Sequence, residues 1–161
     1  LIKLRYFNPA GSHSSGLLRE DPRINTENIF PTIYKVIKRD IEYFPIYGGD
    51  WPTKDGTCVR DYIHITDLAE AHTSALKYSN SKKNLNLILN IGTGEGKSVI
   101  ELIKTFSRVN NVKIPYKIMQ RRLGDSPYLV ANNSLALKLL DWNPKRTLKD
   151  ICVDFWKSLK K

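Results

Sequence analysis

The 161 residues are 41% hydrophobic and 26% charged, which is the balance of one ordinary globular unit. The longest apolar stretch, Leu87–Ile91, is too short to span a bilayer, and no charged start followed by an apolar run marks a signal peptide, so we expect a soluble, cytoplasmic protein. The net charge of +10 would suit nucleic acid, an anionic membrane or a polyanionic small ligand as a partner. The lysines, however, form no basic stripe interleaved with aromatic residues. We therefore predict neither nucleic acid nor a membrane as a partner.

The chain opens in an extended segment. Residues 2–5 alternate apolar and basic side chains, and the run ends at the Asn8–Pro9 step. A lone strand cannot satisfy its own backbone, so it pairs either within this chain or with residues upstream. The Gly-, Ser-, Pro- and Asp-rich residues 9–27 are expected to form a long loop. A helix is predicted over residues 29–38, with Pro31 in its first turn.

The remaining chain alternates short strands and helices, which predicts an α/β unit whose surface is built from loops. The first of the later helices is expected to open at Thr66 or Asp67, and the last at a capping box of Thr147 and Asp150. The expected strands are residues 44–48, 58–65, 87–91 and 114–120, and the expected helices are residues 66–79, 99–109 and 147–160.

The segment LNIGTGEGKS, residues 89–98, looks like a phosphate-binding loop but misses both known templates by one residue. A phosphate loop ending in Lys97 and Ser98 would need glycine where Ile91 stands, and the dinucleotide fingerprint would need it where Lys97 stands. We therefore interpret the segment as a structural turn between a buried strand and a helix that starts with a Ser98–Glu101 capping box.

Metal and disulfide chemistry find little support in the sequence. Cys58 and Cys152 are far apart and lack CxxC spacing, which is typical of reduced thiols. The three histidines show neither HExxH nor another paired-ligand spacing. We expect no metal site.

Arginines beside turn residues are better candidates for ligand chemistry. Arg60 precedes Asp61, and Arg121 and Arg122 precede a bend at Gly124. A forked guanidinium suits a phosphate or diphosphate, and a nearby carboxylate can accept from ribose hydroxyls. The alternative is that Arg60 only forms a structural ion pair with Asp61 or another carboxylate.

Two YxxxK pairs, Tyr34 with Lys38 and Tyr78 with Lys82, have the spacing of a tyrosine proton relay. Chance matches are expected in a chain with many Tyr and Lys residues. Neither pair is followed by the strand and ligand loop that would complete a site. We therefore interpret both as surface features.

Four segments taken in order carry a family resemblance: LRYFNPAGSHSSG with EDP, YGGDWPTKDGTCVRDYIHITDLAEAH, LNIGTGEGKSVIELI and RRLGDSPYLVAN. Together they resemble the C-terminal half of the UDP-glucose 4-epimerase family, which belongs to the extended short-chain dehydrogenases/reductases. The resemblance covers essentially all of the chain. It implies an α/β fold in which residues 1–161 form a single partial unit. This unit is the C-terminal substrate-binding domain together with the last strands of the NAD-binding Rossmann sheet. The N-terminal Rossmann portion is absent.

The family interconverts UDP-galactose and UDP-glucose with a tightly held NAD, which carries the redox chemistry. Its glycine fingerprint, its catalytic Ser or Thr and its catalytic YxxxK all precede the strand that ends in RYFNP. The resemblance therefore implies that this chain holds no catalytic residue, is inactive alone, and belongs to an enzyme that is a homodimer through the absent half. By chain order, Tyr34 and Lys38 cannot be the family's pair.

The resemblance also implies binding roles, position by position. Tyr6 and Phe7 correspond to residues flanking the nicotinamide, Arg60 to the arginine that binds the diphosphate, and Leu129 to a residue whose bulk limits room beside the sugar 2-substituent. The implied contacts of the UDP-hexose substrate are Asn8, Asn28, Ile29, Pro45, Ile46, Tyr47, Arg60, Arg122, Asp125 and Leu129.

Other functions remain open at this point. A nucleotide-sugar dehydratase or decarboxylase of the same superfamily is the nearest alternative, although such enzymes usually vary the VRDYIH segment. From other classes, a non-catalytic nucleotide-sugar-binding module or a basic nucleic-acid binder would fit the charge. Nucleic-acid binding would collapse steeply with salt, whereas UDP binding would depend on it modestly.

Overall fold

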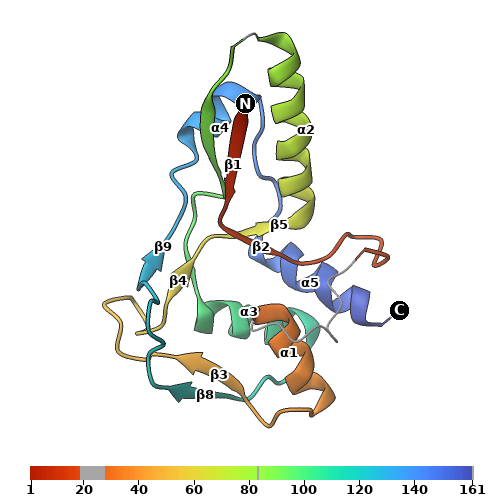
Figure 1. Ribbon diagram of the computed structural model, residues 1–161. Coiled ribbons are helices and arrows are strands. Elements are labelled where there is room, and N and C mark those ends of the chain that lie inside the picture. Colours follow the sequence, from red (N-terminus) through yellow and green to blue (C-terminus); the bar gives the residue numbers. More distant parts are fainter. Residues whose placement is uncertain (19–27, 83, 161) are drawn as a thin grey trace.

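A pair of parallel strands, β1 (Ile2–Tyr6) and β6 (Leu87–Ile91), forms the upper part of the molecule in Figure 1. The computed structural model describes residues 1–18, 28–82 and 84–160. Helices α2 (Ile65–Ser81) and α4 (Ser134–Leu140) cover the face of the pair that carries its apolar side chains. The opening strand thus pairs within the chain. Its other edge has no partner strand in the described residues.

The lower part of the molecule is built on a second parallel pair, β3 (Phe44–Tyr47) and β8 (Tyr116–Met119) (Figure 1). Helices α1 (Ile29–Lys38), α3 (Val99–Asn110) and α5 (Leu148–Leu159) pack together beside it. Their shared core is aromatic: the ring of Phe155 lies 4.8 Å from that of Phe30 and 6.3 Å from that of Phe106, centroid to centroid. Such tilted pairs stabilise a core beyond the area that they bury.

Short strands join the two parts. β4 (Val59–Arg60) lies between β7 (Lys97–Ser98), to which it is antiparallel, and β9 (Tyr128–Leu129), to which it is parallel. β5 (Tyr62–His64) pairs instead with β2 (Asn8–Ala10). The single strand predicted over residues 58–65 is therefore wrong: it is divided at Asp61, because its two halves pair with different neighbours.

The predicted helices are confirmed, with two corrections at their starts. α5 has the expected capping box of Thr147 and Asp150. α3 has only half of its box: Ser98 caps the Glu101 N–H, whereas the Glu101 carboxylate lies 3.8 Å from Lys97 Nζ. α2 does not open at Thr66 or Asp67, because the ring nitrogen Nδ1 of His64 accepts the Thr66 N–H at 3.0 Å. Sequence reasoning missed this cap because histidine is rarely an N-cap.

Four short elements were not predicted: β2, β7, β9 and α4. Each is held by partners distant in the sequence, and strands of two or three residues carry no periodicity. Part of the loop expected over residues 9–27 lies outside the described residues, and residues 8–10 of the described part form β2. No helix in the described ranges is long and apolar enough to cross a membrane.

The imidazole of His64 joins the start of α2 to α5. It is fully buried, and Nε2 lies 3.3 Å from Asp154 Oδ2. Because Nδ1 accepts a backbone N–H, the neutral ring carries its proton on Nε2 and donates it to Asp154. Burial lowers the pKa of His64, and Arg146 acts in the same direction, against the opposing effect of the Asp154 and Asp67 carboxylates.

Stability is therefore expected to fall as the pH drops below about 6.5, the pKa of an unfolded histidine. Below that value unfolded chains take up a proton more readily than His64 does in the fold, with a slope of at most about 1.4 kcal/mol per pH unit. His64→Asn should keep the helix cap without titrating. Urea unfolding between pH 5 and 8 checks this: the free energy of unfolding should fall more steeply with falling pH in the wild type than in His64→Asn, and an equal slope in both proteins would contradict it.

Candidate functional site

A cavity of about 700 Å³ lies between the chain after β1, the start of α1, strand β3 and the end of β4. It brings together segments that are far apart in the sequence. Ten of the twelve residues predicted to bind cofactor or substrate line it: Phe7, Asn8, Asn28, Ile29, Pro45, Ile46, Tyr47, Arg60, Arg122 and Asp125.

Two arginines and one carboxylate form the polar wall of this cavity. Arg60 Nη2 lies 3.4 Å from Asp125 Oδ1, and Arg122 Nε lies 3.1 Å from Asp125 Oδ2. Two guanidinium groups thus meet one carboxylate at this wall, and guanidinium groups that line a cavity favour an anionic ligand. The guanidinium of Arg122 also stacks over Tyr47, 4.4 Å from the ring centroid. The predicted grouping of Arg60, Arg122 and Asp125 thus exists in the fold.

Arg60 is held from behind by the backbone. Its Nη1 donates to the carbonyl oxygens of Val59 at 2.9 Å and Ser126 at 2.7 Å, and only 15% of its side chain is exposed. The structural alternative, an ion pair of Arg60 with Asp61 or another carboxylate, is met in its second form: Arg60 pairs with Asp125 and not with Asp61. A guanidinium oriented in this way is pre-organised for a phosphate oxygen.

The Asp61 carboxylate fills the glycine-rich turn that resembles a phosphate loop. It accepts the backbone N–H groups of Thr93 at 2.8 Å, Gly94 at 2.9 Å and Ala131 at 3.2 Å, and the Thr93 hydroxyl at 2.6 Å. A side chain on Gly92 would collide with this carboxylate, since its Cβ would lie 2.5 Å from Asp61 Oδ2. The N–H groups that could cradle a phosphate already hold an anion of this chain, which supports the interpretation of a structural turn.

Tyr6 and Leu129 do not line the cavity. The Tyr6 hydroxyl lies 2.7 Å from His72 Nε2 on α2, because successive side chains of a strand point to opposite sides and Phe7 is the one that faces the cavity. Leu129 lies in β9 and is 48% exposed. Their roles beside the nicotinamide and the sugar stay predictions.

The YxxxK pairs lie outside this cavity. Tyr34 and Lys38 are on α1, where Lys38 Nζ sits 5.8 Å from the centroid of the Tyr34 ring. Tyr78 packs against the core beside β1 and β6, and Lys82 is the residue after α2. Neither pair lines the cavity. Both tyrosine rings pack partly buried against a core cluster, so they are not purely surface features.

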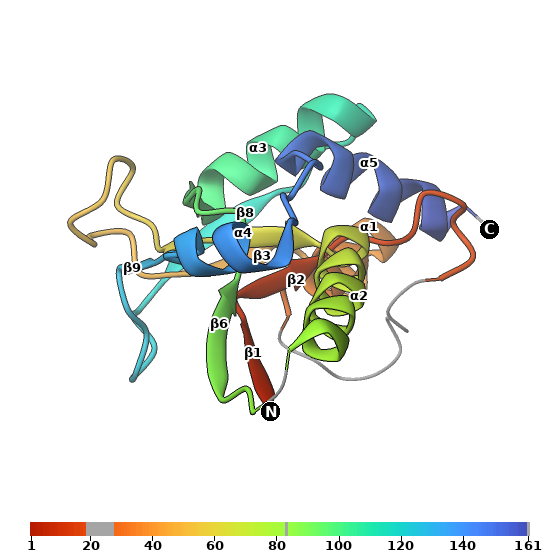
Figure 2. The ribbon, with the colours of Figure 1, turned by 90° about the horizontal axis from the view of Figure 1, so that it is seen from above.

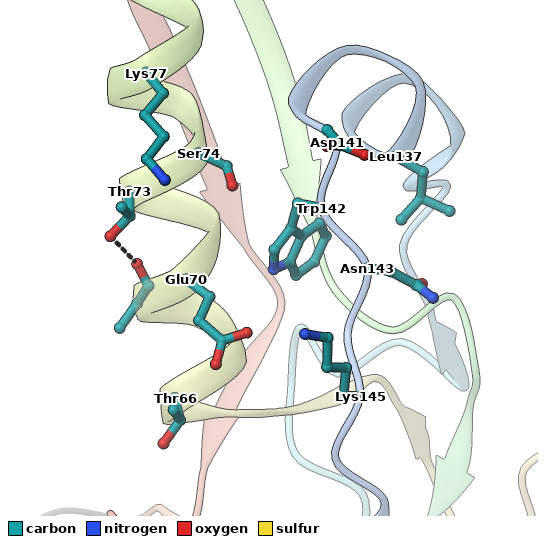
Figure 3. A pocket seen from close by; sticks show the side chains of 11 residues that line it. Thr66, Glu70, Thr73, Ser74, Lys77, Leu137, Asp141, Trp142, Asn143 and Lys145 are labelled. Carbon is teal, nitrogen blue, oxygen red and sulfur yellow. Dashed lines mark hydrogen bonds between the residues drawn. The ribbon is translucent and has the colours of Figure 1, made fainter.

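A second hollow, of about 770 Å³, lies between α2 and the chain after α4 (Figure 3). Glu70 and Asp141 share its rim with Lys77 and Lys145, so it carries both signs of charge. The indole of Trp142 is buried, with its N–H donating to the Asp67 carbonyl at 3.0 Å. None of the predicted binding residues lines this hollow, and its mixed charge selects no ligand class.

Several residues of the first cavity were not predicted, including Lys35, Phe44, Cys58 and Tyr62. Tyr62 had a signal in the sequence, because it lies two residues after Arg60 and alternate residues of an extended chain face the same side. Cys58, two residues before Arg60, has the same signal, whereas Lys35 and Phe44 become neighbours of Arg60 only through the fold.

Comparison with known proteins places the fold and the site in a family. A sequence model described as GDP-mannose 4,6 dehydratase matches residues 1–155. The chain belongs to this family, the extended short-chain dehydrogenases/reductases, as the resemblance implied. Among its curated relatives are UDP-glucose 4-epimerases from Cyamopsis tetragonoloba, 43% identical over 98% of this chain, and from Bacillus subtilis, 42% identical over 96% of it. It spans 45% of the length of each.

Solved structures agree. A UDP-glucose 4-epimerase from Stenotrophomonas maltophila, with bound NAD and formylated UDP-arabinopyranose, is 42% identical with a TM-score of 0.93. The one from Bifidobacterium longum, in complex with NAD+ and UDP, is 39% identical with a TM-score of 0.90. Each match covers 99% of this chain and 47% of the solved chain. The α/β fold and the family predicted from the sequence are confirmed.

Proposed function

We propose that this chain is the UDP-sugar-binding half of an NAD-dependent enzyme that interconverts UDP-galactose and UDP-glucose. The observation that carries the proposal is the cavity in which Arg60 and Arg122 share Asp125 beside the Tyr47 ring. Arginines suit a diphosphate, and a carboxylate suits ribose hydroxyls. The apolar segment around Ile46 offers a surface for the flat base.

The chain fits NAD only at one end of the cofactor. In open α/β sheets, ligands bind at the carboxyl ends of the parallel strands. Strands β1 and β6 end together at Tyr6 and Ile91, and the next residue, Phe7, lines the cavity. Asp61 occupies the one glycine-rich turn of the described residues that could have held a pyrophosphate. When bound, NAD supplies the acceptor and donor of hydride. The part of this chain is to hold and orient the nucleotide sugar.

The exposed edge of β1 supports a division of the enzyme into two parts. Parallel sheets are normally covered on both faces and contain more than two strands. Here α2 and α4 cover one face, and Figure 2 shows β1 and β6 at the margin of the molecule. We infer that the N-terminal portion continues this sheet, carries the catalytic residues and forms a homodimer. Placement in the cytoplasm and in galactose metabolism is part of the same proposal and rests on the family resemblance.

The test is turnover of UDP-galactose by the full-length polypeptide with NAD, followed by separation of the nucleotide sugars. UDP-glucose is the expected product; a 4-keto-6-deoxy sugar or a pentose would indicate the dehydratase or decarboxylase alternative. Residues 1–161 alone are expected to give no turnover. Turnover by this part alone would contradict the proposal that the catalytic residues lie in the N-terminal portion. Tyr34 or Tyr78 would then be a candidate for the catalytic tyrosine.

A further inference from the structure

The hydroxyl of Tyr62 is a buried polar group without a hydrogen-bond partner in the part of the chain that the structure describes. The side chain is 6% exposed, and its ring belongs to the apolar cluster around Phe30 and Phe106. Within residues 1–18, 28–82 and 84–160, its oxygen makes no hydrogen bond. Buried hydroxyls are nearly always hydrogen-bonded, because leaving one unpaired costs free energy. An unpaired one therefore needs an explanation.

The position of Tyr62 supplies one, because this residue lines the cavity that Arg60 also lines. The two flank Asp61, whose carboxylate points to the opposite side, into the glycine-rich turn. The guanidinium of Arg60 is close enough for its charge to act on the phenol. Tyr62 and Arg60 thus line the same cavity.

We propose that the Tyr62 hydroxyl donates a hydrogen bond to the anionic group that Arg60 binds, a phosphoryl oxygen of the nucleotide diphosphate. The ligand then supplies a partner that no described protein group supplies. This inference rests on the proposed function and adds a binding residue to it.

The chemistry of the phenol agrees with a donor. Burial raises the pKa of Tyr62, so the group keeps its proton throughout the physiological range. Tyr62 is thus able to donate to an anion and unable to act as a base. No described protein group competes with the ligand for this hydroxyl, so its hydrogen bond to the ligand contributes to affinity.

The experiment compares wild-type full-length protein with Tyr62→Phe, using UDP as the probe. UDP affinity, measured by calorimetry, is expected to fall about tenfold, the scale of a hydrogen bond to a charged group. The Tm of the free variant is expected to stay equal or to rise, because the change removes an unpaired hydroxyl and keeps the ring. Tyr34→Phe, outside the cavity, is the matched control and should leave UDP affinity unchanged.

Each other outcome is informative. Equal UDP affinity in wild type and Tyr62→Phe would overturn this inference and leave the proposed function standing. A variant that is less stable without ligand would also overturn it, since the hydroxyl would then have a partner within the protein. Failure of the wild-type protein to bind UDP would overturn the proposed function, and this inference with it.

Discussion

Replacing Asp61 with Ala is expected to lower the free energy of unfolding by about 3–5 kcal/mol. The side chain is fully buried and accepts three backbone N–H groups and one hydroxyl. Each donor left without an acceptor in the interior costs about 1–3 kcal/mol, and relaxation and entering water recover part of the sum. Chemical denaturation of the wild-type and variant proteins measures the difference.

Asp40→Ala is the matched control, because it removes the same carboxylate from an exposed position. Its effect should stay within about 0.5 kcal/mol. The loss in free energy of unfolding of Asp61→Asn should lie between those of Asp61→Ala and Asp40→Ala. The amide retains one acceptor oxygen, but its NH₂ group faces donors. A loss below about 1 kcal/mol in Asp61→Ala would show that the glycine-rich turn does not depend on this carboxylate.

The same residue connects stability to the binding site. The Asp61 side chain ties the glycine-rich turn to Ala131, while its backbone donates to the Leu129 carbonyl at 3.1 Å and accepts the Asn8 N–H at 2.9 Å. Arg60 precedes it and Asn8 lines the cavity, so both sides of the site depend on this one junction. Losing Asp61 should therefore also weaken UDP binding, in a protein whose fold is already less stable.

Local sequence patterns were sufficient where one segment carries its own signal. Helices α1, α3 and α5 have apolar faces with clear helical spacing, and their bounds agree with the predictions to within a residue or two. The glycine-rich turn was interpreted correctly because both templates failed on identifiable residues, Ile91 and Lys97. What no local pattern could give is the anion inside that turn. Asp61 lies some thirty residues earlier and reaches the turn only through the tertiary fold.

The candidate site came from the family resemblance more than from patterns. Arg60 alone was ambiguous, since a turn arginine serves equally as a structural ion pair. The structure shows an ion pair of Arg60 with Asp125 and places Arg122, from the same loop some sixty residues away, on the same carboxylate. The binding role of Arg60 stays a prediction. Tyr6 was assigned by position in a motif, but its direction depends on the pleat of β1, which turned its hydroxyl toward His72.

Arg60→Ala is expected to raise the Kd for UDP about thirtyfold, which corresponds to about 2 kcal/mol. The variant loses a forked guanidinium that can donate to a phosphate, and with it one of the two positive charges that lie beside Asp125. Arg60→Lys should fall between wild type and Ala, because it keeps the charge without the planar fork. Calorimetric titration of the full-length protein with UDP measures all three.

Arg121→Ala provides the control, since it removes the same charge from a neighbouring loop position. Arg121 pairs with Asp50 at 2.8 Å and stacks over Trp51, and it does not line the cavity. Its Kd for UDP should therefore change less than about threefold, which is the screened effect of one distant charge. If both variants weakened binding equally, the effect would be one of net charge, and Arg60 would have no specific place in the site. If Arg60→Ala alone does so, the ligand contacts this guanidinium directly, because the two substitutions remove the same charge and differ only in where it stood.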